Sequence, residues 1–119
     1  MNLEIFREYC LSKKGVTEEL PFGPETLVYK VMGKMFALTG LDSEIFSFNL
    51  KNTPEKNQEL RGEYEAIIPG YHMNKQHWNT VYANHSIKDS LLRELIDDSY
   101  DLVAKSLTKK IQEELKNLY

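Results

Sequence analysis

The first half of the chain alternates hydrophobic and polar positions in ways that predict one helix followed by three strands. Residues near the N-terminus have helical spacing, and Asn2 can cap this helix while Gly15 can end it. Residues 26–40 alternate with a period of two around Gly33, which predicts a β-hairpin. Residues 44–50 alternate again, so three strands with short connections predict an antiparallel meander. The apolar face of the first helix would consist of Leu3, Phe6, Tyr9 and Cys10.

The second half of the chain is predicted to be mainly helical. Pro54 can begin a helix with Thr53 as its cap. Residues 77–83 favour a fourth main strand, because Trp, Thr, Val and Tyr are strand-forming types. Helical spacing then continues to the end of the chain. We expect Ser86 and Asp89 to form a capping box and Asp97-Asp98-Ser99 to divide two helices, residues 87–96 and 98–117.

Together these elements predict a single α+β domain over residues 1–119. Their order is α-β-β-β-α-β-α-α, with helices packed on one face of an antiparallel sheet. No internal repeat or Pro/Gly/Ser-rich linker divides the sequence. One shared core between sheet and helices is expected from Phe46, Phe48, Trp78, Leu92, Leu95, Ile96 and Val103.

Composition restricts the class of protein further. The 119 residues are 41% hydrophobic and 28% charged, as in a globular domain, and no apolar run approaches the length of a membrane span. The N-terminal residues carry charges instead of an apolar signal core, so we expect a cytoplasmic protein without a membrane partner. A net charge of −3 and a pI near 5.6 count against a strongly basic nucleic-acid binder but allow a local basic patch.

Two segments lack acidic residues and form the main candidate site. Residues 66–88 and residues 26–41 contain no Asp or Glu, although the chain has 18 of them. The first segment also holds all three histidines and the only tryptophan. Lysines can neutralise phosphate, amide side chains including Asn79 can bond base edges, and aromatic rings can stack on bases, so this combination suits nucleic acid. The lysines of the last helix, Lys105, Lys109 and Lys110, are expected to contribute much less.

The same residues also have a purely structural interpretation. Large aromatic side chains usually pack in cores, and surface lysines are usually only solvated. The spacing of His72, His77 and His85 matches no common metal motif and no carboxylate lies between them, so we expect no metal and no cofactor. Cys10 lies on an apolar helix face, where a thiol is inert, and neither G-x-S-x-G nor a phosphate-binding glycine loop is present. We therefore expect a protein that is not an enzyme.

Several motifs resemble the MmcQ/YjbR family. The longest is the string PGYHMNKQHWNTV at residues 69–81, and it is preceded by PFGP at residues 21–24 and by KV-x-GKMFA at residues 30–37. The pattern LI-x-x-SY-x-LV at residues 95–103 is the last match, and all the matches follow the order that they have in the family. Gln76 departs from the family, where a basic residue is common, as does the segment 83–86, where an Asp-Gly turn is frequent.

The resemblance implies a single α+β domain similar to the double-wing DNA-binding domain of the phage transcription activator MotA. It therefore implies a DNA-binding protein, although this function rests on fold analogy. The alternative is a non-catalytic domain that binds a small ligand or a protein, with residues 69–78 as a pocket wall. The candidate binding residues under either hypothesis are Lys30, Lys34, Tyr71, His72, Asn74, Lys75, His77 and Trp78.

Overall fold

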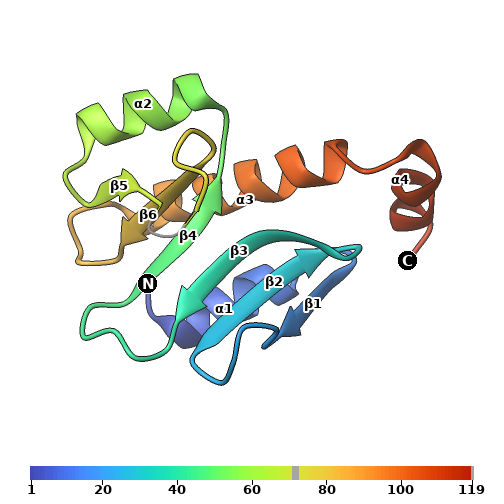
Figure 1. The fold of residues 1–119 in the computed structure, drawn as a ribbon, viewed down its shortest axis with the longest axis horizontal. Helices are drawn as coiled ribbons and strands as arrows, with labels where there is room; N and C mark the ends of the chain where they lie inside the picture. The colour runs from blue at the N-terminus through green and yellow to red at the C-terminus, as the bar shows by residue number, and fades with distance from the viewer. Residues whose placement is uncertain (71–72, 119) are drawn as a thin grey trace.

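A six-stranded antiparallel sheet is the centre of the computed structural model, which describes residues 1–70 and 73–118. The strands lie in the order β1-β2-β3-β4-β6-β5. Figure 1 shows α1 and α3 behind the sheet, α2 beside β5 and β6, and α4 beyond the end of α3. The elements are α1 (Leu3–Leu11), β1 (Val16–Glu19), β2 (Thr26–Val31), β3 (Lys34–Gly40), β4 (Ser47–Lys51), α2 (Pro54–Glu63), β5 (Ile67–Pro69), β6 (Trp78–Tyr82), α3 (Asp89–Lys105) and α4 (Lys109–Lys116).

Most local signals in the first half of the chain are confirmed, but α1 ends at Leu11 with Ser12 as its C-cap, before the predicted stop at Gly15. Asn2 caps α1, since its Oδ1 accepts a hydrogen bond from the Ile5 amide at 2.9 Å. The predicted hairpin is β2 and β3, joined by Met32 and Gly33. These two residues have φ values of 49° and 87°, the paired positive φ of a type I′ turn, whose twist suits a hairpin. The α+β class and the antiparallel sheet are therefore as predicted.

The structure contains two short edge strands, β1 and β5, that the sequence analysis did not predict. Each borders the sheet on one side, and they contain four and three residues. The sequence of β1 is VTEE, which shows little hydrophobic alternation, and β5 ends at Pro69, which has no amide to donate. Short, charged or proline-ended strands are typical of sheet edges, because these features discourage pairing with other chains.

The sheet has a different hydrophobic cluster on each face, which corrects the prediction of one shared core. The main cluster lies between the sheet and the helices and includes Phe48, Leu92 and Ile96, with Phe46 packed against it. Trp78 is not part of it. Instead it forms a second cluster with Val28, Leu38 and the partly buried Met35 and Met73. Trp78 opposes Lys51 in the register, one position out of phase with the core residue Leu50, so the alternation along β6 turns its ring to the other face.

The predicted helix break at residues 97–99 is wrong. α3 continues to Lys105, and the break falls at residues 106–108, where the Thr108 hydroxyl caps α4. Ser99 does not end the helix because its side chain has tertiary partners. Its hydroxyl accepts from the Lys51 amide at 2.8 Å and donates to the Phe36 carbonyl at 2.5 Å, which ties α3 to β4 and β3.

The predicted capping box at Ser86 is also wrong. α3 begins at Asp89 after the N-cap residue Lys88, which makes no side-chain capping bond. The Ser86 hydroxyl instead donates to Asn84 Oδ1 at 2.6 Å and stabilises the turn before the helix. Asp89 accepts a bond of 2.9 Å from the N-terminal amino group, so its carboxylate joins the start of α3 to the start of α1.

Candidate functional site

Two lysines lie on the sheet face opposite α1 and α3, which we call the open face. The register places Lys30 opposite Met35 and Lys51 opposite Trp78. Lys30 lies on β2 and Lys51 on β4, with β3 between them, and the direct pairing of β3 with β4 ends at Ala37 and Leu50, next to Lys51. Lys51 was not among the predicted site residues. Extending the alternation of residues 44–50 by one position would have placed it on this face.

The open-face lysine on β2 already has an acidic partner. Lys30 Nζ lies 3.1 Å from Oε1 of Glu19 on the neighbouring edge strand. The pKa of Glu19 is lowered, first by a hydrogen bond from Thr17 and then by Lys30. A phosphate that binds Lys30 therefore has to compete with this carboxylate.

The other predicted hairpin lysine points elsewhere. Lys34 opposes the core residue Val31 in the register, and its Nζ lies 3.5 Å from the Ser106 carbonyl at the end of α3. Lys34 thus lies close to Lys30 across the hairpin, but the two side chains point to opposite faces of the sheet. Lys34 belongs to the end of the molecule where α3 meets α4.

The loop between β5 and β6 carries the remaining predicted residues, of which Tyr71 and His72 lie outside the described part of the chain. Asn74 organises the loop from within, since its Oδ1 accepts from the Gln76 amide at 2.9 Å. Lys75 Nζ donates to the Gly70 carbonyl at 3.2 Å. A side chain at Gly70 would place its Cβ 3.0 Å from Cβ of Trp78 and 3.1 Å from its carbonyl oxygen, so the close approach of loop and strand favours glycine there.

A polar network that sequence analysis missed fastens this loop to α2. Arg61 Nε donates to Asn79 Oδ1 at 2.6 Å, and Arg61 Nη2 donates to the carbonyls of Lys75 and Trp78. Asn57, one turn earlier on α2, donates to the Gln76 carbonyl at 3.0 Å and accepts from Asn79 at 2.9 Å. The signal was present in the sequence as two polar residues four apart on the helix, which place both side chains on one face.

This network changes the expected role of Asn79. The sequence suggested that its amide could bond base edges, but the residue is 2% exposed and its amide is occupied by Asn57 and Arg61. Trp78 is 7% exposed, so its ring stacks on a base only if the loop opens. His77 is half-buried, and its carbonyl accepts from the Asn52 amide at 2.9 Å. The accessible cations are consequently the main chemical feature of the site.

Within residues 1–70 and 73–118, no group of three His, Cys, Asp or Glu side chains is placed to hold a metal ion. Cys10 is fully buried in the main cluster, and this burial raises the pKa of its thiol to about 12. A thiol in this state is protonated at neutral pH and is a poor nucleophile.

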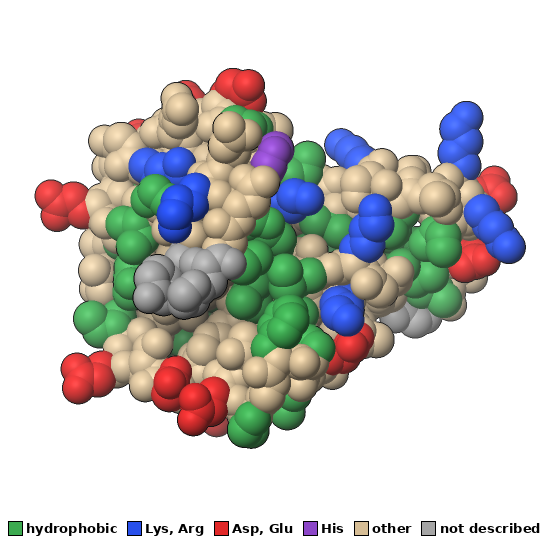
Figure 2. All heavy atoms as spheres, viewed as in Figure 1, with side chains coloured by type: hydrophobic (Ala, Val, Ile, Leu, Met, Phe, Trp, Pro, Cys, Tyr) green, Lys and Arg blue, Asp and Glu red, His purple; other side chains and the backbone are tan. Residues whose placement is uncertain are grey.

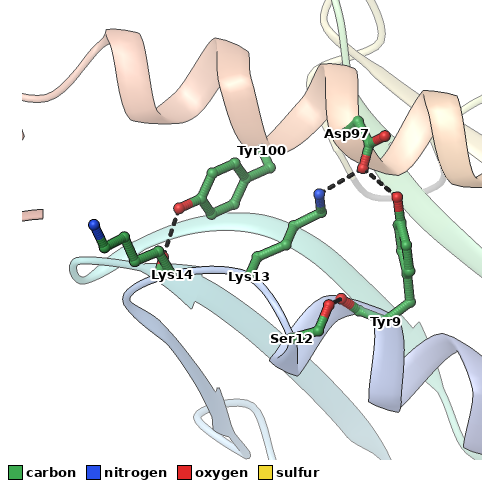
Figure 3. A network of polar contacts seen from close by, with 6 residues as sticks. All are labelled: Tyr9, Ser12, Lys13, Lys14, Asp97 and Tyr100. Carbon is green, nitrogen blue, oxygen red and sulfur yellow. Dashed lines mark hydrogen bonds and ion pairs between the residues drawn. The ribbon is translucent and has the colours of Figure 1, made fainter. Parts of the chain in front are cut away.

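A second polar cluster joins α1 to α3 and has a structural role (Figure 3). Asp97 Oδ1 accepts from Tyr9 at 2.6 Å and from Lys13 at 2.5 Å. Lys13 Nζ also lies 5.2 Å from the ring centroid of Tyr100, whose hydroxyl donates to the Lys14 carbonyl. Two effects raise the pKa of Tyr9 to about 12: burial, which is the larger, and the hydrogen bond to Asp97. These side chains are engaged with one another, so the cluster fixes the end of α1 against α3.

Charge is unevenly distributed on the open-face side of the molecule. Figure 2 shows Lys and Arg side chains around and to the right of a central hydrophobic area. Most Asp and Glu side chains in this view lie at the lower edge and the outer rim. The cations therefore surround an apolar area, although the whole chain has a net charge of −3.

These features define an α+β domain with one antiparallel sheet, whose open face carries lysines and a loop held by an arginine. Among the described residues, no helix is both long and apolar enough to cross a membrane. A family model described as YjbR matches residues 11–102. The chain belongs to the YjbR family, as its motifs indicate.

Relatives support this assignment along most of the chain. The uncharacterized protein YbdF of Escherichia coli O157:H7 is 44% identical over 96 residues, which cover 81% of this chain and 79% of YbdF. The uncharacterized protein YjbR of Escherichia coli K12 is 31% identical over 100 residues, which cover 84% of this chain and 85% of YjbR. Neither name states an activity or a ligand.

Solved structures show the same fold. The crystal structure of Deinococcus radiodurans protein DR2400, described with the domain family DUF419, matches with a TM-score of 0.90 and 39% identity. The match covers 97% of this chain and 88% of that protein. A crystal structure of a Pseudomonas syringae protein matches with a TM-score of 0.74 and 30% identity, covering 86% of this chain and 98% of the other.

Proposed function

We propose that this protein binds duplex DNA weakly through the open face of its sheet. The observation that carries the proposal is the presence of Lys30 and Lys51 on the same face of the sheet, with Lys75 in the adjoining loop. Duplex DNA carries one negative charge per ~1.7 Å of axis, so lysines that share one face of a protein can meet several phosphates on one side of a duplex. The proposal assigns no catalytic role, no cofactor and no metal to the protein.

The charge balance predicts the character of this binding. Three lysines would give a slope near −2.7 for the logarithm of affinity against the logarithm of salt concentration, at ~0.9 per phosphate contact. The rest of the surface carries excess acid and repels the DNA backbone. Binding should therefore be weak, strongly salt-dependent and largely independent of sequence, since phosphate contacts do not distinguish bases.

The test is a fluorescence-anisotropy titration of a labelled 8-base-pair duplex at several salt concentrations. Lys30→Gln/Lys51→Gln should lower the salt slope by about 1.8, because two phosphate contacts are lost. The matched control is Lys56→Gln/Lys88→Gln, two exposed lysines of which Lys56 lies beside Asp98 on the α3 side. Equal slopes for the two variants would contradict the open-face site. No binding of the unmodified protein at ~50 mM salt would contradict DNA binding altogether.

The second cluster favours one other candidate function. Val28, Leu38 and Trp78 form a buried cluster on the open-face side of the sheet, and the partly exposed Met35 and Met73 pack against it. Methionines adapt their shape to different partners, so this area suits an apolar ligand or a protein surface. Under this alternative, Met35→Ser should abolish partner binding, whereas the lysine variants should have little effect.

A further inference from the structure

We propose that a cleft beside the end of α2 binds a small organic cation, an ammonium group carried on an apolar stem. The cleft has a volume of about 460 Å³, within the ~300–1,000 Å³ that is usual for small-molecule sites. It lies next to α2, β5 and β6, which Figure 1 shows on the side of the molecule away from α4. Six of its lining residues matter for the argument: Ile45, Glu63, Tyr64, Glu65, Tyr82 and Asn84.

Backbone hydrogen bonds bring the walls of this cleft together from three parts of the chain. The Tyr82 amide at the end of β6 donates to the Ala66 carbonyl at 2.9 Å, just after the end of α2. The next amide, of Ala83, donates to the Phe46 carbonyl at 2.9 Å, just before β4. The end of β6 therefore lies between the other two segments, and the main chain alone fixes this arrangement.

Two tyrosine rings and one aliphatic side chain form the apolar part of the cleft. Tyr64 and Tyr82 pack against the main cluster and remain half-buried, so the core holds their rings in place beside the cleft. Ile45 is 52% exposed. The faces of tyrosine rings carry negative potential and attract ammonium groups, while an aliphatic wall suits an apolar stem.

The charge of the cleft is negative and is not balanced by the protein. Glu63 and Glu65 line it and are exposed, and no Lys or Arg is among its described lining residues. In the described part of the chain, neither carboxylate has an ion-pair or hydrogen-bond partner, and the same is true of the Tyr64 and Tyr82 hydroxyls. By contrast, the Glu18 carboxylate is held by an arginine. A cation therefore supplies the partner that these groups lack.

A bare metal ion fits this cleft less well than an organic cation. Within residues 1–70 and 73–118, no group of three His, Cys, Asp or Glu side chains is placed to share an ion, so two glutamates would have to hold it alone. Aromatic rings, moreover, are recurrent partners of ammonium groups rather than of hydrated divalent ions. The combination of rings, aliphatic wall and unpaired carboxylates selects for charge and apolar surface in one molecule.

The experiment compares three probes that share one aromatic ring and differ in charge: benzylammonium, benzyl alcohol and benzoate. Each is titrated into the protein and followed by proton–nitrogen NMR. Benzylammonium should shift the amide signals of Glu65, Tyr82 and Asn84 in a saturable way. Benzyl alcohol should bind about fivefold more weakly, since it lacks the attraction to the carboxylates, and benzoate should not bind. Equal binding of the alcohol and the ammonium would overturn the proposal.

A pair of double variants tests the two carboxylates. Glu63→Gln/Glu65→Gln should weaken benzylammonium binding about fivefold, because two exposed ion pairs are lost. The matched control, Glu55→Gln/Glu59→Gln, removes the same charge from exposed positions of α2 outside the cleft and should leave the affinity nearly unchanged. An equal decrease in both variants would show a response to net charge and would overturn the site. The four side chains are exposed, so the variants should fold, and thermal melts verify this.

Two further probes distinguish the possible sources of the cation. Butylammonium and the blocked tripeptide acetyl-Gly-Lys-Gly-amide carry the same alkylammonium group, free in one case and as a lysine side chain in the other. Either compound binding in the cleft supports the cation site. The tighter of the two then assigns its natural occupant as a free amine or as a basic side chain of a protein. If neither compound shifts the cleft amides, the proposal is wrong, whereas DNA binding by the open face is unaffected.

Discussion

Arg61 on α2 and Asn79 on β6 are joined by a hydrogen bond of 2.6 Å from Nε to Oδ1. The same guanidinium also donates to the carbonyls of Lys75 and Trp78. One side chain thus connects a helix, a strand and the loop that carries much of the family motif. The shape of the loop depends on α2 as well as on its own residues.

Replacing this arginine should loosen the loop. Arg61→Ala leaves Asn79 Oδ1 without its donor, and hydrogen bonds to charged groups contribute ~1.5–3 kcal/mol. We expect a loss of about 2 kcal/mol in the free energy of unfolding and faster hydrogen exchange at the amides of Gly70 and Trp78. Glu59→Ala, an exposed position on the same helix, is the control and should change neither. Unchanged exchange in Arg61→Ala would show that the loop is held by other contacts.

The two hydrophobic clusters should respond independently to mutation. Phe48→Leu affects the main cluster and Trp78→Phe the second one, and each should cost about 1–2 kcal/mol. Because the side chains lie on opposite faces of the sheet, the double variant should lose the sum of the two within ~0.5 kcal/mol. Chemical denaturation of the single and double variants measures this. A coupling energy above 1 kcal/mol would indicate one continuous core.

Acid should destabilise the fold through Glu18. Its carboxylate accepts bonds from Arg7 at 2.7 and 2.9 Å and from Tyr29 at 2.7 Å, and chiefly the bond from Arg7 lowers its pKa. A lowered folded-state pKa stabilises the protein above the unfolded value of ~4.3, and this stabilisation disappears as the pH falls through the folded-state pKa.

Glu18→Gln tests this pH dependence directly. At pH 6 the variant should be less stable than the unmodified protein, and the difference should shrink steadily below pH 4. Denaturation curves between pH 2.5 and 7 measure the difference. A constant difference across this range would show that the contribution of Glu18 is independent of its charge.

Removing the acidic partner of Lys30 should strengthen DNA binding. Glu19→Gln abolishes the ion pair of 3.1 Å, so Lys30 no longer has to exchange a carboxylate for a phosphate. The affinity for an 8-base-pair duplex should rise several-fold, because one negative charge beside the proposed site is also lost. The control is Glu8→Gln, at an exposed position on α1. It also removes one negative charge, but on the other side of the sheet, so it should raise the affinity less. Equal effects would indicate a response to net charge alone.

Metal removal should leave the protein unchanged. The described residues hold no group of three side chains suited to a metal ion, and the histidine spacing matches no metal motif. Thermal melts with and without a strong chelator should coincide. A decrease of several degrees that zinc restores would contradict this prediction.

Sequence predicted well those parts of the fold that depend on neighbouring residues. The cap at Asn2, the turn at Gly33 and the start of α2 at Pro54 are local features, and each is confirmed. The long family string also identified the family, because the order of its residues is specific.

Features that depend on distant partners could not be read from the sequence. Ser99 resembled a helix breaker, yet its hydroxyl bonds β3 and β4 and the helix continues. Trp78 resembled a residue of the main core, but the strand register placed it on the other face. Lys30 and Lys34 point to opposite faces of the sheet for the same reason, since neither the register nor the end of α3 is specified locally.

The fluorescence of Trp78, in the second cluster, can report on the loop without any added label. Trp78 is the only tryptophan in the chain and is 7% exposed, close to the loop that Arg61 holds. Intrinsic indole fluorescence of the unlabelled protein therefore comes from one position, immediately beside the candidate site. Contact of water with that ring shifts its emission to longer wavelength, so each opening of the loop, or each partner that displaces it, changes a signal that no other residue can produce.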